Sequence, residues 1–177
     1  LKAGESLNHS GRVVPQETQE EESGGSGLSG SRKPRRPDKE DGIRRSQRLL
    51  LTWLIETPAL FEKIEGIITA DDFVENLYHQ VAQMVFDGHR EGNLNPAAIL
   101  SRFINDEDQY KEVAALFNAS LKESLNNEEQ KKAFSETVMK VRKNSLDVAS
   151  RNAKDITQLQ EIIRQQAALK QLHISLD

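Results

Sequence analysis

The fold of this chain is decided by one stretch, Leu49-Leu50-Leu51-Thr52-Trp53-Leu54-Ile55. Its apolar side chains would cover nearly every side of a helix, and a helix of that kind lies at the centre of a bundle. We therefore expect a helix over about Arg44 to Glu56 with other helices around it. Thr57-Pro58 follows, and this pair is suited to end one helix and begin the next, because a proline at the first helical position loses no hydrogen bond.

Four further helices are predicted after this central one. A short helix ends at Gly66, and a third helix opens at Thr69-Ala70-Asp71-Asp72 and closes at Gly88 and Gly92. The third helix has the clearest amphipathic face of the sequence, with apolar residues at three- and four-residue spacing: Phe73, Val74, Leu77, Tyr78, Val81, Ala82 and Val85. Asn95-Pro96 and Asp106 start the fourth and fifth helices.

The predicted fold class is therefore all-α, because no stretch shows the two-residue alternation of a half-buried strand. Residues 43–125 are expected to form a compact helical bundle, small but large enough for a core. Acidic residues outnumber basic ones in this part, and the reverse holds for residues 126–177.

Residues 126–177 predict a long C-terminal helical hairpin. Asn126 and Glu129 indicate the start of a long helix that reaches about Ala153, and Asp155 caps the last helix. The long helix carries two thin apolar stripes, and a two-helix unit cannot bury both against itself. The surplus apolar surface must contact the bundle or another protein. The last helix offers anchors at the spacing of a helix that lies in a groove: Ile162, Ile163, Leu169 and Leu172.

Residues 1–42 predict a disordered linker. They contain no aromatic residue, three of the five prolines, and an acidic run, a Gly/Ser run and a basic run in succession. A segment with so few apolar residues cannot bury enough surface to order itself. The basic run at Arg32 to Arg36 is more typical of a solvated linker than of a phosphate-binding site, so we expect DNA contact to be weak or indirect.

Composition excludes several classes of protein. There is no cysteine, which excludes disulfide scaffolds and Cys-ligated metal sites. No apolar run approaches the roughly 20 residues that cross a bilayer. The 28 acidic residues exceed the 24 basic ones, so the whole chain is not a basic nucleic-acid binder. The chain opens on Leu1 without a signal peptide, which predicts a cytoplasmic, excised piece of a longer protein.

No catalytic constellation, metal site or cofactor site is expected. Asp71, Asp72 and Glu75 gather in the first turn of a predicted helix, where carboxylates serve as caps. No two histidines stand three or four residues apart, and no phosphate-binding glycine loop occurs. An enzyme that uses the helix-borne carboxylates is one hypothesis for this chain, and it predicts stoichiometric divalent metal in the purified protein.

Several segments together resemble the C-terminal helicase-binding domain of bacterial replicative DNA primase, and the likeness covers about Ile43 to Asp177. The segments are Leu50-Leu51-Thr52-Trp53-Leu54-Ile55, Ile68-Thr69-Ala70-Asp71-Asp72-Phe73, Tyr78-His79-Gln80-Val81, Gly88-His89-Arg90-Glu91-Gly92 and Asn95-Pro96-Ala97-Ala98-Ile99-Leu100. In that family a helical bundle is followed by a terminal hairpin. The N-terminal collar domain of the helicase itself looks similar and is the alternative.

The resemblance implies a module that docks on the N-terminal collar of the hexameric replicative helicase, recruits primer synthesis to the replication fork and modulates helicase activity. The catalytic domain of the parent primase, a primer-synthesising nucleotidyltransferase, would lie upstream. We expect the module to be monomeric alone, whereas a collar domain would self-associate. The hairpin anchors Ile162, Ile163, Leu169 and Leu172 are the expected helicase contacts.

Overall fold

The computed structural model of the chain describes residues 39–121 and 125–176. The elements in this part of the chain are all helical, in the order α1 (Lys39–Glu56), α2 (Leu60–Ile64), the 3-10 helix η1 (Ala70–Asp72), α3 (Asn76–Arg90), α4 (Pro96–Ser101), α5 (Glu107–Asn118), α6 (Asn127–Asn152) and α7 (Ile156–Leu169). The predicted all-α bundle with a C-terminal hairpin is confirmed. Residues 1–38 of the expected linker lie outside the described residues, whereas 39–42 belong to the first turn of α1.

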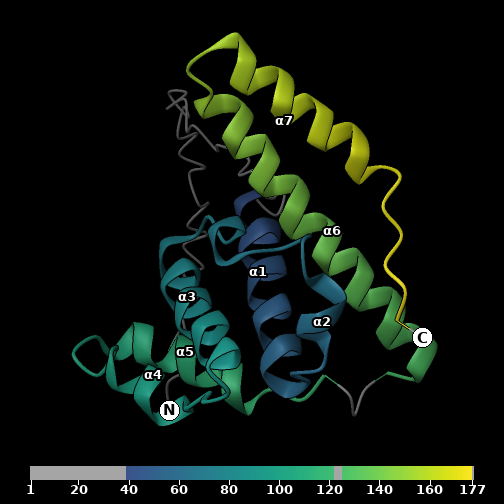
Figure 1. Ribbon diagram of the computed structural model, residues 1–177. Helices are drawn as coiled ribbons and strands as arrows, with labels where there is room; N and C mark the ends of the chain where they lie inside the picture. The colour runs from purple at the N-terminus through teal and green to yellow at the C-terminus, as the bar shows by residue number, and fades with distance from the viewer. Residues whose placement is uncertain (1–38, 122–124, 177) are drawn as a thin grey trace, which may run out of the picture. The chain divides into compact units, whose positions relative to one another are not determined.

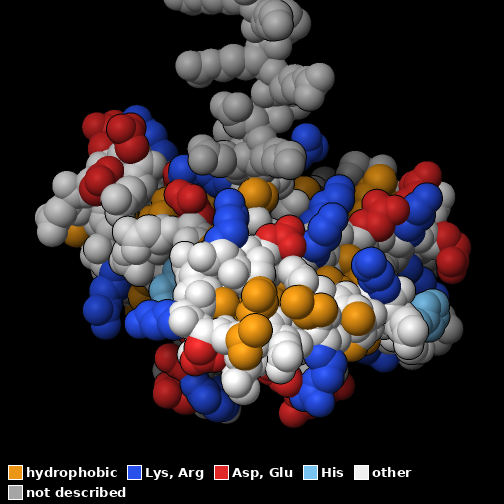
Figure 2. All heavy atoms as spheres, turned by 90° about the horizontal axis from the view of Figure 1, so that it is seen from above, with side chains coloured by type: hydrophobic (Ala, Val, Ile, Leu, Met, Phe, Trp, Pro, Cys, Tyr) orange, Lys and Arg blue, Asp and Glu red, His pale blue; other side chains and the backbone are white. Residues whose placement is uncertain are grey.

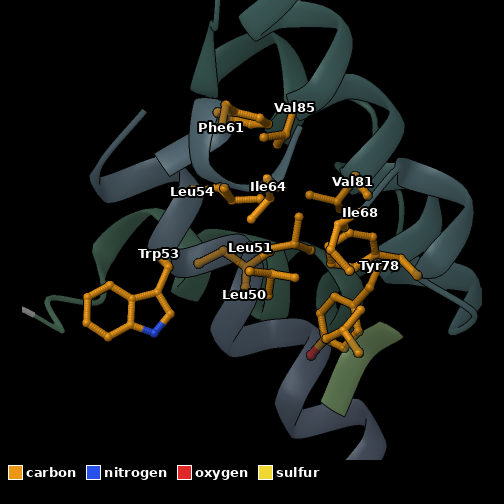
Figure 3. Close-up of a cluster of buried hydrophobic side chains, with 14 of the residues drawn as sticks. Leu50, Leu51, Trp53, Leu54, Phe61, Ile64, Ile68, Tyr78, Val81 and Val85 are labelled. Carbon is orange, nitrogen blue, oxygen red and sulfur yellow. The ribbon is translucent and has the colours of Figure 1, made fainter. Parts of the chain in front are cut away.

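Helix α1 stands at the centre of the bundle, in contact with α2, α3, α5 and α6 (Figure 1). Leu50, Leu51 and Leu54 are completely buried. Figure 3 shows Leu51 and Leu54 among side chains from other elements, with Ile64 and Val81 beside them. An all-round apolar helix is stable only when neighbours cover each side, so the central position expected from the quoted stretch is confirmed.

The third helix does not begin at Thr69, and this prediction is wrong. Residues Ala70–Asp72 form the separate turn η1, and α3 starts at Asn76. Between them Phe73 adopts an extended backbone with a fully buried side chain. At the other end Gly88 lies inside α3, and Gly92, with φ of 67°, follows the helix in the left-handed conformation that glycine tolerates best.

The caps predicted for α4, α5 and α6 are present. Asn95 accepts hydrogen bonds from two backbone N–H groups of α4, and Asp106 accepts one from Gln109. Asn126 and Glu129 form a reciprocal capping box at the start of α6. Each of these side chains satisfies N–H groups that the helix cannot pair itself, which explains why these boundaries were readable from the sequence.

Helix α6 packs against α1 and belongs to the core of the bundle. Phe134, Val138 and Val141 are buried in the same cluster as the leucines of α1, and Phe134 meets Trp53 edge to face at a ring-centre distance of 6.2 Å. The sequence pattern changes at residue 126, but the described parts of residues 43–125 and 126–177 do not have separate hydrophobic cores. Residues 37–177 form one compact unit.

Candidate protein-binding surface on the last helix

Helix α7 begins at a polar cap directly after α6. The chain leaves the helical conformation at Ala153, and the side chain of Asp155 accepts a hydrogen bond from the N–H of Gln158 at 2.8 Å. The N–H of Lys154 donates to the side chain of Gln158 at 3.1 Å. This tight turn places α7 antiparallel to α6, at the top of Figure 1.

Helix α7 lies on α6 without burying any residue completely. Ile162 and Leu169 are half-buried, and two side-chain hydrogen bonds accompany them. The guanidinium of Arg142 donates to Gln165 at 3.1 Å, and the amide of Gln166 donates to Asp147 at 3.2 Å. One side of α7 is thus attached to α6, and the opposite side stays open.

The open side of α7 carries two isoleucines, two helical turns apart. Ile156 is 72% exposed and Ile163 is 53% exposed, and they lie on one face because residues separated by seven positions nearly coincide around a helix. Figure 2, seen from above, shows hydrophobic side chains gathered on this upper face with acidic and basic side chains at its border. An apolar stripe within a charged border is typical of a protein-binding surface.

The four predicted anchors do not form a single surface. Of the four, Ile163 alone is exposed, whereas Ile162 faces the hairpin interior. Leu169 and Leu172 meet at a small recess of about 170 Å³ that also involves Gly66 and Ile67 from the loop after α2. Leu169 and Leu172 are thus half-buried beside the loop after α2. The structure adds the exposed Ile156, which a helical projection of α7 would have revealed.

The surplus apolar stripe of α6, which suggested a partner, is covered by the chain itself. Phe134, Val138 and Val141 of one stripe are in the core, and Leu146 of the other is 2% exposed. Within the hairpin, the large apolar side chains that remain exposed are on α7 rather than on α6. Ile156 and Ile163, rather than the stripe of α6, are therefore the exposed apolar residues that a partner could cover.

A buried carboxylate ties the two helices of the hairpin to the bundle. Asp72 of η1, 3% exposed, accepts hydrogen bonds from Arg142 at 2.7 Å and from Ser145 at 2.6 Å, both on α6. Its other oxygen accepts from the N–H of Thr69 at 2.8 Å. Because Arg142 also donates to Gln165, one arginine links η1 and α7. The capping role expected for Asp72 is present, and the ion pair is an addition that no sequence spacing indicated.

A second charged cluster joins α1, α3 and α5. Arg44 donates to both carboxylate oxygens of Glu112 at 2.6 Å and to Glu75 at 3.2 Å, and the hydroxyl of Tyr78 donates to Glu112 at 2.5 Å. Burial opposes ionisation of Glu112, but the hydrogen bonds from Arg44 and Tyr78 outweigh it and lower its pKa. Burial, followed by the hydrogen bond to Glu112, raises the pKa of Tyr78 to about 12. These groups are paired with each other, as structural ion pairs are.

The described part of the chain holds no group of three or more His, Asp or Glu side chains placed to bind a metal ion. Within the same residues, none of the helices has the length and apolar character that crossing a membrane requires. Comparisons with protein-family models, with curated proteins and with solved structures give no match to this chain.

Proposed function

We propose that this chain is a non-catalytic docking module, the helicase-interaction module of a bacterial replicative primase. In this proposal it binds the N-terminal collar of the hexameric replicative helicase, brings primer synthesis to the fork and modulates the helicase. The partner comes from the sequence resemblance. The all-helical bundle with a terminal hairpin is the architecture that this resemblance implies.

The observation that carries the proposal is the open face of α7 with Ile156 and Ile163. Full burial of an isoleucine side chain stabilises a complex by about 1.5–3 kcal/mol relative to its exposure, so two isoleucines in water on one face favour a partner that covers them. A helix with one attached and one open side is suited to lie in a groove of another helical protein.

The experiment mixes the chain with a hexameric replicative helicase and measures binding by size-exclusion chromatography and titration. Ile163→Asp should weaken the complex by about 2 kcal/mol or more, which is roughly thirtyfold in affinity. Thr157→Asp is the control, because it adds the same charge to α7 at an exposed residue that follows Ile156 but projects about 100° away from it around the helix. This position near the helix N-terminus favours a carboxylate.

Three outcomes would contradict the proposal. Separate elution at micromolar concentration would remove the helicase as partner. An equal loss of affinity in both variants would remove the isoleucine face as the contact. Dimers or trimers of the chain alone in sedimentation would favour the collar domain of a helicase instead, since that domain acts by self-association.

A further inference from the structure

The chain beyond α7 returns along α6. Helix α7 ends at Leu169, where the N–H groups of Gln171 and Leu172 donate to the carbonyls of Ala168 and Leu169. Residues 172–176 then run without regular secondary structure beside α6, toward the end of α6 that is far from the hairpin turn (Figure 1).

Burial alternates along this returning segment. Leu172, Ile174 and Leu176 are half-buried, whereas His173 and Ser175 are exposed. Ile174 and Leu176 pack against the main hydrophobic core. Successive side chains of an extended chain point to opposite sides, so the segment attaches to the bundle with one apolar side and presents its polar side to solvent.

Leu176 reaches a recess built from three helices. It lines a cavity of about 390 Å³ together with Trp53 of α1, Leu60 of α2 and Phe134 of α6. The floor is aromatic, since Trp53 and Phe134 meet there edge to face. The rim carries charged side chains, among them Lys63 and Glu128. Leu176 therefore supplies one apolar wall of the recess, beside the aromatic pair.

This contact matters because α7 has few other attachments. No residue of α7 is buried, and its N-terminal end is held by the turn at 153–155. The returning segment attaches its C-terminal end, through half-buried side chains rather than fully buried ones. Elements with few buried contacts open first in a folded protein, so this segment and α7 are the parts of the described chain best placed to open together.

We propose that the recess around Trp53 is a docking site for the chain's own C-terminal segment, and that residues 172–176 act as a releasable strap over α6. With the strap closed, α7 lies on α6 and shows Ile156 and Ile163. With the strap open, α7 stays tethered to α6 by the turn at 153–155 and can lift away from it, which breaks its hydrogen bonds to Arg142 and Asp147 and makes Ile162 and Leu169 accessible. The strap does not depend on the proposed helicase partner, and its test uses this chain alone.

The test replaces the two inward side chains of the strap in the full chain, Ile174→Ser together with Leu176→Ser. Trp53 is the single tryptophan of the sequence, so its fluorescence reports on the recess directly. The variant should show a red-shifted emission and stronger quenching by acrylamide. Loss of two half-buried aliphatic side chains should speed amide exchange in α7 about tenfold, with α1 and α3 unchanged. His173→Ser, an outward position of the same strap, should change neither signal.

A second arm tests the recess as a docking site. A synthetic peptide with the sequence of residues 170–177 is added to the double variant, and it should reverse the tryptophan shift saturably, whereas a scrambled peptide should not. Wild-type fluorescence and exchange in the double variant would overturn the strap. Equal loss of protection in α1, α3 and α7 would overturn it too, because Leu176 would then belong to the cooperative core. A peptide without effect would overturn the docking site.

Discussion

At the scale of single residues, the hydrogen bonds of Glu112 join three helices of the bundle. Its carboxylate accepts from Arg44 and from Tyr78, and so connects α1, α3 and α5. Spacing along the sequence gave no sign of this, because Arg44 and Glu112 stand 68 positions apart. Two predictions test what the cluster contributes.

Replacing Glu112 by Gln should lower the free energy of unfolding at neutral pH by about 1.5–3 kcal/mol, the usual range for a hydrogen bond to a charged group. The folded-state pKa of Glu112 is lowered, so its contribution is present above the unfolded pKa near 4.3 and is lost as pH falls through the folded pKa. Urea unfolding at several pH values should therefore show a smaller acid dependence in Glu112→Gln. The control is Glu107→Gln, which removes an exposed ion pair with Lys111 on the same helix. If both variants lose the same stability, the cluster around Glu112 contributes no more than an exposed ion pair.

The raised pKa of Tyr78 predicts how the stability of the protein changes at high pH. Its folded-state pKa is raised to about 12, whereas an unfolded tyrosine ionises near 10. The stability that neutral Tyr78 contributes is complete below pH 10 and is lost as pH rises from 10 to 12. Unfolding followed over this range should show falling stability, and Tyr78→Phe should flatten the curve. A curve of unchanged slope in Tyr78→Phe would show that other groups cause the loss.

At the scale of elements, the turn η1 explains why α3 starts late. The backbone remains extended at Phe73 and at Glu75, whose N–H donates to the side chain of the buried Gln47 at 3.1 Å. A continuous helix from Thr69 would move that N–H away from Gln47 and would withdraw Phe73 from the core. Tertiary packing therefore divides a segment whose local pattern is helical.

Asp72→Asn should separate η1 from α6. The substitution removes the buried charge to which Arg142 and Ser145 donate, and we expect a loss of about 2–3 kcal/mol in stability because Arg142, which is 26% exposed, loses its ion pair. Amide exchange of α7 should also rise, since Arg142 links η1 to Gln165. Asp71→Asn is the control on the same turn, with an exposed side chain. Loss of stability without any change in α7 would contradict the link.

At the scale of the whole unit, bundle and hairpin share one core, and this predicts one unfolding transition. Phe134 of α6 is 1% exposed and packs on Trp53 of α1, so Phe134→Ala should destabilise the protein by about 3–5 kcal/mol. In the wild-type protein and in Phe134→Ala, the unfolding curves measured by circular dichroism and by tryptophan fluorescence should coincide, as in a two-state transition. Two separate transitions would indicate that residues 43–125 and 126–177 fold independently.

For the residues that the structure describes, the sequence by itself determined the all-α class, the presence of seven α-helices and the caps of α4 to α7. It did not determine the starts of α2 and α3, because Thr57 does not cap α2 and Thr69 precedes η1. The features that it did determine depend on residues close together in the chain. The Asn95-Pro96, Asp106 and Asn126-Glu129 starts satisfy N–H groups within one helical turn, and helical periodicity is visible over a few turns.

The tertiary structure decided which apolar faces remain open. Periodicity marks Ile162, Ile163, Leu169 and Leu172 alike as apolar positions of one helix, but the packing of α7 on α6 and on the loop after α2 left Ile163 exposed and drew Leu169 and Leu172 inward. The same holds for Asp72, whose capping role is local whereas its pairing with Arg142 spans 70 positions. Contacts between distant residues depend on how whole helices pack, and local sequence spacing does not contain that information.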